Sequence, residues 1–167
     1  MPKLSQEAVQ KINFTLNGDA ETGVAEPRML LSDFLRNVMG VTGCHVGCEH
    51  GVCGACTVQI DGKVQRSCLT LAVQVEGRRV DTVESLAGRE NELTDLQQAF
   101  KTHHGLQCGY CTPGILMSAS EYLQQNPNPT EEEVRDMLSG HLCRCTGYAG
   151  IVNAIMATAK QRQENKS

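Results

Sequence analysis

Apolar and polar residues alternate with a period of about two in the first half of the chain. Residues 11–17 show this alternation, and the Asn17-Gly18-Asp19 segment is typical of a β-hairpin turn. The second strand of that hairpin is expected around residues 21–24. Residues 57–60 and 63–66 flank an Asp-Gly pair in the same way. The pattern therefore predicts a small sheet.

One helix is expected to pack across this sheet. It is predicted over residues 29–38, where apolar side chains at positions 30, 31, 34, 35 and 38 fall on one helical face. Gly40 can end it, because glycine favours the position just after a helix.

From about Asp81 the apolar period changes to about 3.6, which is typical of helices. Thr112 is expected to cap one of these helices, with Pro113 in its first turn. Thr130 and Glu133 form a capping box that opens another, which runs through Leu138. The helix that Thr112 caps is predicted over residues 114–125, and the remaining helices over 82–87, 94–104 and 148–162, followed by a frayed tail at 163–167.

The composition indicates two small domains. Only 4% of the 167 residues are aromatic and none is Trp, so neither half can form a large core. Small domains of this kind often need a metal to supplement apolar burial. We therefore expect an α+β chain with a sheet domain over residues 1–83 and an all-helical domain over residues 84–167.

Eight of the nine cysteines fall into two groups of four. The first group has the spacing C-x4-C-x2-C, and its fourth member follows after eleven residues; the second joins a C-x2-C pair to a C-x-C pair after thirty-one residues. The first group is Cys48, Cys53, Cys56 and Cys68, and the second is Cys108, Cys111, Cys143 and Cys145.

These spacings favour iron–sulfur clusters. C-x4-C-x2-C is the plant-type ferredoxin signature, whereas zinc sites favour paired C-x2-C knuckles. A Rieske centre is excluded, because no cysteine is followed by x-x-His. Glycines at 43, 47, 51 and 54 would let backbone N–H groups approach the sulfides. The spacing of the second group is less specific, and zinc remains an alternative there.

The remaining polar candidates have simpler interpretations. Cys44 is expected to be a small buried residue, with an additional ligand as the alternative. Arg144 either offsets thiolate charge or forms a surface salt bridge. Among the histidines, loop-surface positions are expected for His45 and His50, and structural or exposed positions for His103, His104 and His141.

Composition and motifs exclude several classes of protein. The net charge is −4, and neither half carries a basic patch of the kind that binds nucleic acid. The N-terminus is polar, and no apolar stretch is long enough to span a membrane, so we expect a cytoplasmic location where thiols bind metals. No general base, nucleophile or dinucleotide-binding fingerprint is evident. The residues thus indicate an electron relay.

The chain resembles the small iron–sulfur subunit of molybdenum hydroxylases, the xanthine oxidase family, which includes carbon monoxide dehydrogenases and N-heterocycle dehydrogenases. The resemblance runs from about residue 11 to 160 and includes all eight cysteines of the two groups in family order. The motifs that carry it are residues 42–58, 67–68, 105–114 and 142–148.

This resemblance implies a β-grasp, ferredoxin-like 2Fe–2S domain followed by a four-helix 2Fe–2S domain. It assigns Cys108, Cys111, Cys143 and Cys145 to a cluster beside a molybdopterin cofactor on a large subunit. It assigns Cys48, Cys53, Cys56 and Cys68 to a cluster facing FAD on a medium subunit. In the family the amide of Gln107 contacts the pterin, and the sulfur of Cys145 approaches the pterin amino group.

The implied protein is a non-catalytic electron-transfer subunit of an oxidoreductase. It would pass electrons singly from molybdenum to flavin within a heterotrimer or a dimer of heterotrimers, and the substrate would be an N-heterocycle, an aromatic compound or an aldehyde. The alternatives are a free-standing two-cluster ferredoxin that shuttles between enzymes and a zinc-stabilised interaction module.

Overall fold

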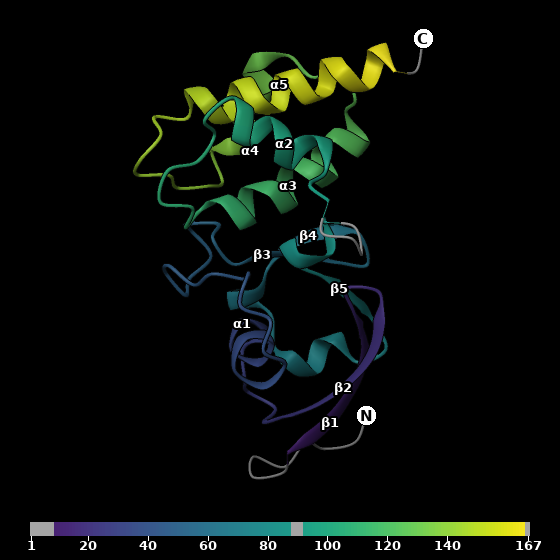
Figure 1. The fold of residues 1–167 in the computed structure, drawn as a ribbon. Helices are drawn as coiled ribbons and strands as arrows, with labels where there is room; N and C mark the ends of the chain where they lie inside the picture. Colours follow the sequence, from purple (N-terminus) through teal and green to yellow (C-terminus); the bar gives the residue numbers. More distant parts are fainter. Residues whose placement is uncertain (1–8, 88–91, 166–167) are drawn as a thin grey trace.

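The computed structural model describes residues 9–87 and 92–165 and contains a mixed sheet with strand order β2-β1-β5-β3-β4 (Figure 1). β1 and β2 are antiparallel, β5 runs parallel to β1, and β3 is antiparallel to both β5 and β4. The strands are β1 (Gln10–Leu16), β2 (Asp19–Ala25), β3 (Thr57–Ile60), β4 (Lys63–Arg66) and β5 (Arg79–Asp81).

Both predicted hairpins are confirmed. Asn17 and Gly18 have φ angles of 53° and 95°, and Asp61 and Gly62 have φ angles of 51° and 76°. Two successive residues with positive φ form the tight turn whose twist matches that of paired strands. The Asn-Gly and Asp-Gly pairs therefore determine the register of β1 with β2 and of β3 with β4.

The predicted helix across the sheet begins as α1 (Leu31–Asp33) and continues as a π-helical segment, η1 (Phe34–Val38). Phe34 packs on Phe14 of β1 with ring centroids 5.6 Å apart. On β2, a Cβ atom at Gly23 would lie 2.3 Å from the Phe34 ring, so this position requires glycine. These contacts lie at the centre of the first of two hydrophobic cores.

The second core lies among α2 (Asp95–Thr102), α3 (Thr112–Gln125), α4 (Glu131–Leu138) and α5 (Ala149–Glu164). Its buried residues include Leu96, Phe100, Ile115 and Ile155. The expected box at Thr130 and Glu133 opens α4, and a second box between Thr94 and Gln97 opens α2. We call residues 9–81 the sheet region and residues 95–164 the helical region.

Helix α3 joins the two regions, and Figure 1 shows it between the sheet and the other helices. A Cβ atom at Gly114 would lie 2.2 Å from the carbonyl oxygen of Gly54, so the helix touches the sheet region backbone to backbone. Further along, Gln59 Nε2 donates to the Met117 carbonyl at 3.0 Å. The backbone N–H of Val64 donates to the buried Glu121 carboxylate at 2.7 Å. The interface is thus closely packed and polar.

Several sequence-based predictions were wrong in detail. Cys111, not Thr112, is the N-cap of α3, and Thr112 is the first helical residue. Strand β5 was not predicted, because three residues are too few to show a period. The helix expected over 82–87 is only the 3₁₀ turn η4 (Val83–Ser85). The last helix runs to Glu164, beyond the predicted end at 162.

Two further 3₁₀ turns, η2 (Ser67–Leu69) and η3 (Ala72–Val75), connect β4 to β5.

Across residues 9–87 and 92–165, no helix combines the length and apolar character that crossing a bilayer requires. The α+β class is confirmed, whereas the division at residue 83 remains a prediction.

A partly buried ion pair between Asp95 and Arg162 connects the start of α2 to the end of α5, and we expect it to stabilise the helical region. Arg162 donates from Nε and Nη2 to the two oxygens of Asp95, at 2.6 and 2.8 Å, and these bonds lower the pKa of Asp95. Because both side chains are about one-third exposed, Asp95→Asn should reduce the unfolding free energy by only about 1 kcal/mol at pH 7.

Urea denaturation of the chain would measure this effect. A lowered folded-state pKa contributes stability above the unfolded pKa of about 4, and that contribution disappears as the pH falls through the folded value. The difference between wild type and Asp95→Asn should therefore shrink below about pH 4. Glu131→Gln, which removes an exposed pair with Arg135, is the control and should cost less than about 0.5 kcal/mol. An equal loss for both variants would contradict the prediction.

Candidate functional site

The second cysteine group lines one cavity of about 240 Å³. Its thiols come from the loop before α3 and from the loop between α4 and α5. The thiol of Cys145 donates to that of Cys108 with the sulfur atoms 3.4 Å apart, and the thiols of Cys111 and Cys143 are also hydrogen-bonded. Cys111 is buried, whereas Cys108 and Cys145 are exposed. One edge of this site therefore reaches the surface.

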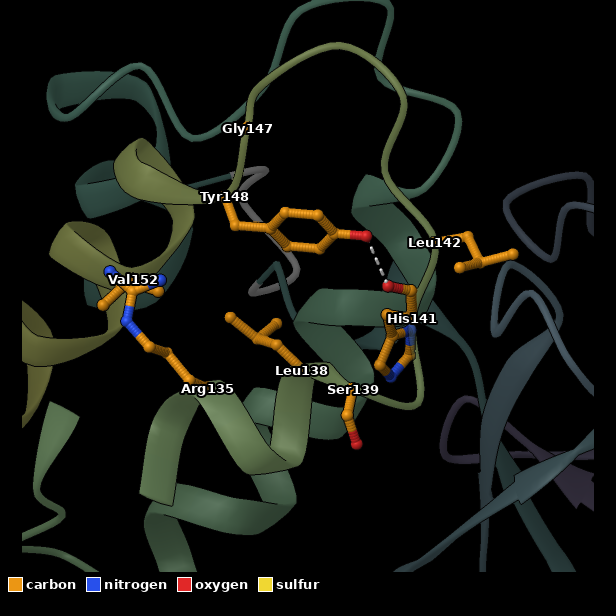
Figure 2. A pocket seen from close by; sticks show the side chains of 8 residues that line it. All are labelled: Arg135, Leu138, Ser139, His141, Leu142, Gly147, Tyr148 and Val152. Carbon is orange, nitrogen blue, oxygen red and sulfur yellow. Dashed lines mark hydrogen bonds between the residues drawn. The ribbon is translucent and has the colours of Figure 1, made fainter. Parts of the chain in front are cut away.

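Tyr148 holds the loop that carries Cys143. Figure 2 shows its ring lying across the loop, with the hydroxyl directed at the carbonyl of His141. That hydroxyl donates to the His141 oxygen at 2.9 Å and accepts from the backbone N–H of Cys143 at 2.8 Å. Tyr148 itself has a left-handed backbone with φ of 67° just before α5. One side chain thus fixes both ends of a three-residue segment.

The first group is formed by a loop and the end of a hairpin. Cys48, Cys53 and Cys56 lie on the loop before β3, and Cys68 lies in η2 after β4. Ser67 donates to the Cys56 carbonyl from its backbone N–H at 3.2 Å and from its hydroxyl at 2.8 Å. These two bonds hold Cys68 beside Cys56, so the β3–β4 hairpin returns the fourth thiol to the loop.

Glycines let this loop wrap closely around its thiols, as predicted. Gly51 and Gly54 have φ angles of 82° and 76°, in the left-handed region that glycine favours. The backbone N–H of Cys53 donates to the sulfur of Cys48 at 3.4 Å. Such inward-pointing N–H groups stabilise negative charge on sulfur.

In both groups the thiols meet in pairs. The Cys145 thiol donates to Cys108. Besides burial, the neighbouring thiol raises the pKa of Cys53 (from Cys48), of Cys68 (from Cys56) and of Cys111 (from Cys143). No group of three or more His, Cys, Asp or Glu side chains in the described ranges is arranged to hold a single metal ion. Two pairs of thiols are what a 2Fe–2S cluster requires, because each of its irons takes two cysteine ligands. The residues present therefore fit this group.

Local hydrogen bonds lower the pKa of Cys48, Cys108 and Cys143, one member of each of three of the four pairs. Hydrogen bonds from the backbone N–H of Cys53 and His50 lower the pKa of Cys48 to about 6. The pKa of Cys108 is lowered by the backbone N–H of Tyr110 and by the thiol of Cys145. Burial raises the pKa of Cys68 and of Cys111 to about 12. Cluster binding must therefore displace protons from the buried thiols, which makes assembly dependent on pH.

The two groups are adjacent in space. Gly47, Cys53 and Ala55 of the first loop line the same cavity as the second group. The backbone N–H of Leu142 donates to the carbonyl of Cys53 at 3.0 Å, one residue before Cys143. A backbone hydrogen bond therefore connects the two groups.

Tyr110 and His45 add a second bridge between the loops. Their rings stack with centroids 4.8 Å apart, and His45 Nδ1 lies 2.8 Å from the Tyr110 carbonyl oxygen. The Tyr110 hydroxyl donates to the carbonyl of Val46 at 2.7 Å. His45 is thus a contact between loops rather than only a loop-surface residue, whereas His50 is exposed as expected.

The other candidates lie largely as expected. Cys44 is buried with its sulfur 3.1 Å from the Ser67 hydroxyl, and burial raises its pKa to about 11. His141 is buried and structural, with Nε2 at 2.7 Å from the Ser118 hydroxyl. Gln107 and Arg144 are exposed, and Arg144 lines the cavity of the second group. His103 and His104 are exposed.

Known families match both regions. Residues 14–87 match the 2Fe–2S iron–sulfur cluster binding domain, and residues 82–156 match the 2Fe–2S binding domain. The chain is 55% identical over 146 residues to the nicotine 6-hydroxylase small subunit of Paenarthrobacter nicotinovorans, covering 87% of each. It belongs to the small iron–sulfur subunits of the molybdenum hydroxylase family. Both 2Fe–2S-binding domain models match within this one chain.

Other members of the family are similar over nearly the full length. Caffeine dehydrogenase subunit gamma of Pseudomonas sp. (strain CBB1) is 51% identical over 159 residues, covering 93% of this chain and 95% of that protein. A chain in the crystal structure of quinoline 2-oxidoreductase from Pseudomonas putida 86 matches with a TM-score of 0.90 and 50% identity. That match covers 98% of this chain and 100% of the other. The arrangement of the two regions is therefore shared with that chain.

Residues that position the sites were missed from the sequence. The hydroxyl of Tyr110 and the guanidinium of Arg66 bond to backbone carbonyl groups 64 and 74 positions away, and the hydroxyl of Tyr148 bonds to a carbonyl seven residues earlier. No periodic pattern reports such bonds. The available signal was the position of Tyr110 between two cysteines and of Tyr148 three residues after Cys145.

We predict that Tyr148→Phe loosens the second site selectively. The change removes a donor to His141 and an acceptor for the Cys143 N–H, so the unfolding free energy should fall by about 1–3 kcal/mol. Iron retained by the second site should fall, while the first site keeps its iron. Iron analysis and EPR would measure this. In the control Tyr122→Phe, the lost hydroxyl accepts from the Asn126 amide at 3.2 Å, and iron content should not change. Equal iron in both variants would refute the role of Tyr148.

Proposed function

We propose that this chain is the electron-transfer subunit of a molybdopterin-dependent hydroxylase. In this role it passes electrons one at a time from a molybdenum site on a large subunit to FAD on a medium subunit. The observation that carries the proposal is the adjacency of two four-thiol sites, joined by the Leu142–Cys53 backbone hydrogen bond. Adjacent redox sites in one small chain are suited to relaying electrons rather than to transforming a substrate.

The proposed ligand sets follow the two groups. Cys108, Cys111, Cys143 and Cys145 hold the molybdenum-side cluster, and Cys48, Cys53, Cys56 and Cys68 hold the flavin-side cluster. When bound, the clusters supply one-electron redox chemistry, while the chain sets their spacing and surroundings.

We assign contact with the pterin to Gln107 and Cys145. Both are exposed, as is Cys108, so this edge of the second site is open to a partner. Cys111, at the N-cap of α3, lies deeper in the chain and nearer the first loop. The difference in exposure between the two sides of the site supports electron entry at the exposed edge and transfer inward.

Exposed apolar residues flank both sites, and they support the proposal that two protein partners bind this chain. Val52 and Leu69 are 57% and 63% exposed beside the first group. Leu106 and Leu142 are 42% and 57% exposed beside the second group. Exposed apolar residues gathered around functional sites are typical of interaction surfaces. We therefore propose a heterotrimer, alone or paired, in the cytoplasm.

We further propose the division of the chain into a β-grasp domain, residues 1–83, and a four-helix domain, residues 84–167. The separate hydrophobic cores support it, since the first contains residues up to Val80 and the second begins at Leu96. Val83 and Leu86 pack against the second core, which supports a boundary near residue 82 or 83.

The substrate class that we propose is an N-heterocycle. Nicotine, caffeine and quinoline, which appear in the names of the three similar proteins above, all contain ring nitrogen. The chemistry would occur on the large subunit, and this chain would remove the electrons.

EPR of the dithionite-reduced complex, with iron, molybdenum and zinc analysis, tests the proposal. The protein should be purified from its host without chelator. Two distinct S = 1/2 signals and about four irons per chain, in a complex with larger subunits and molybdenum, are expected. Two signals in a chain that stands alone and reduces an external protein would instead identify a shuttle. Stoichiometric zinc without a signal would overturn the proposal.

Substitution of a single ligand should separate the two clusters. Cys145→Ser should damage the molybdenum-side cluster and block turnover, while much of the flavin-side signal remains, because the two groups lie on different loops. Cys44→Ala is the matched control and should keep both signals, since Cys44 contacts Ser67 and the Cys56 carbonyl rather than a ligand sulfur. Loss of both signals in folded Cys145→Ser protein would contradict the separate assignment of the sites.

A further inference from the structure

Arg66 joins the loops of the two cysteine groups. It is the last residue of β4, two positions before Cys68, and it is half-buried. Its Nη2 donates to the carbonyl of Gly140 at 2.6 Å, and its Nη1 donates to the Thr57 hydroxyl. Gly140 lies three residues before Cys143, and Thr57 directly follows Cys56. One guanidinium therefore contacts a neighbour of each group.

The two loops meet with no room for side chains at their point of closest approach. A Cβ atom at Gly54 would lie 2.6 Å from the Gly140 carbonyl oxygen and 2.5 Å from His141 Nδ1. The Gly54 carbonyl also accepts from the Thr57 hydroxyl at 2.6 Å. The chain of contacts thus runs from Gly140 through Arg66 and Thr57 to Gly54, on the loop of the first group.

Arg66 is the side chain that supports the direct backbone bridge. The Leu142 N–H donates to the Cys53 carbonyl two residues beyond Gly140, so Arg66 anchors the same short segment. A guanidinium is suited to this task because its donors are rigid and diverge toward two acceptors, which a lysine ammonium cannot match.

We propose that Arg66 is a positioning residue that sets the separation and coupling of the two clusters. The inference rests on the proposed function, in which each cysteine group would hold one cluster and the clusters would supply one-electron transfer, with no bond formed or broken. Without Arg66, the segment 140–142 would be held to the first loop by the Leu142–Cys53 hydrogen bond with less support, and the distance between the clusters would vary.

Two readouts on Arg66→Met test this role in the assembled complex. Amide hydrogen exchange at Leu142 should accelerate by roughly tenfold, the factor that a charge-assisted hydrogen bond typically contributes to local opening. The magnetic interaction between the two reduced clusters, seen as splitting in low-temperature EPR, should weaken or broaden, while the iron content and the g values of each cluster persist.

Matched variants separate positioning from general damage. Lys63→Met removes a contact to Glu121 at 3.8 Å across the same interface, from the other end of β4, and should change neither readout. Arg66→Lys should only partly restore them, because it retains charge but not the double contact. If Arg66→Met loses a cluster, Thr57→Val, which removes one acceptor of Arg66, should still weaken the splitting and speed exchange at Leu142.

Wild-type exchange at Leu142 and wild-type splitting in Arg66→Met would overturn the role of Arg66. The hydrogen-exchange result does not depend on the clusters. A chain that binds no iron would therefore refute the proposed function, while exchange at Leu142 would still decide whether Arg66 holds the loop.

Discussion

The close approach of α3 to the first cysteine loop fixes the relation between the two sites. Gly114 lies against the carbonyl of Gly54, where a Cβ atom would be only 2.2 Å from the oxygen. Cys111 is the N-cap of that helix, and Gly54 follows Cys53. Any larger residue at 114 would move the helix, and with it a thiol of the second group, away from the first. The adjacency of the sites therefore depends on glycine at this contact.

Glu121 and Gln59 are paired across the same interface, which makes the contact specific. Glu121 is buried, accepts from the Val64 N–H at 2.7 Å and from Gln125 at 2.6 Å, and lies near Lys63. A buried carboxylate without such partners would be costly. Because the donors come from both regions, one relative placement satisfies them, and a redox relay needs its two sites at a constant separation.

Local chemistry made much of the fold predictable. Asn17-Gly18 and Asp61-Gly62 specify hairpins, because few other residues adopt positive φ at low energetic cost. Thr130 with Glu133 specifies a helix start. Strand β5 was missed, because its place between β1 and β3 comes from pairing with distant strands. Thr112 was misplaced by one residue, since Cys111 takes the cap position with its backbone rather than with a capping side chain.

The sequence by itself determined the two groups of cysteines, the hairpin that returns Cys68 to its loop, and the family, because spacing and turn chemistry are properties of neighbouring residues. Only the tertiary structure decided that the two groups share a cavity, which thiols pair, and that Arg66, Tyr110 and Tyr148 fix the loops between them. These relations join residues up to 74 positions apart, as between Arg66 and Gly140. They are polar and backbone contacts between loops, and such contacts leave no periodic pattern in the sequence.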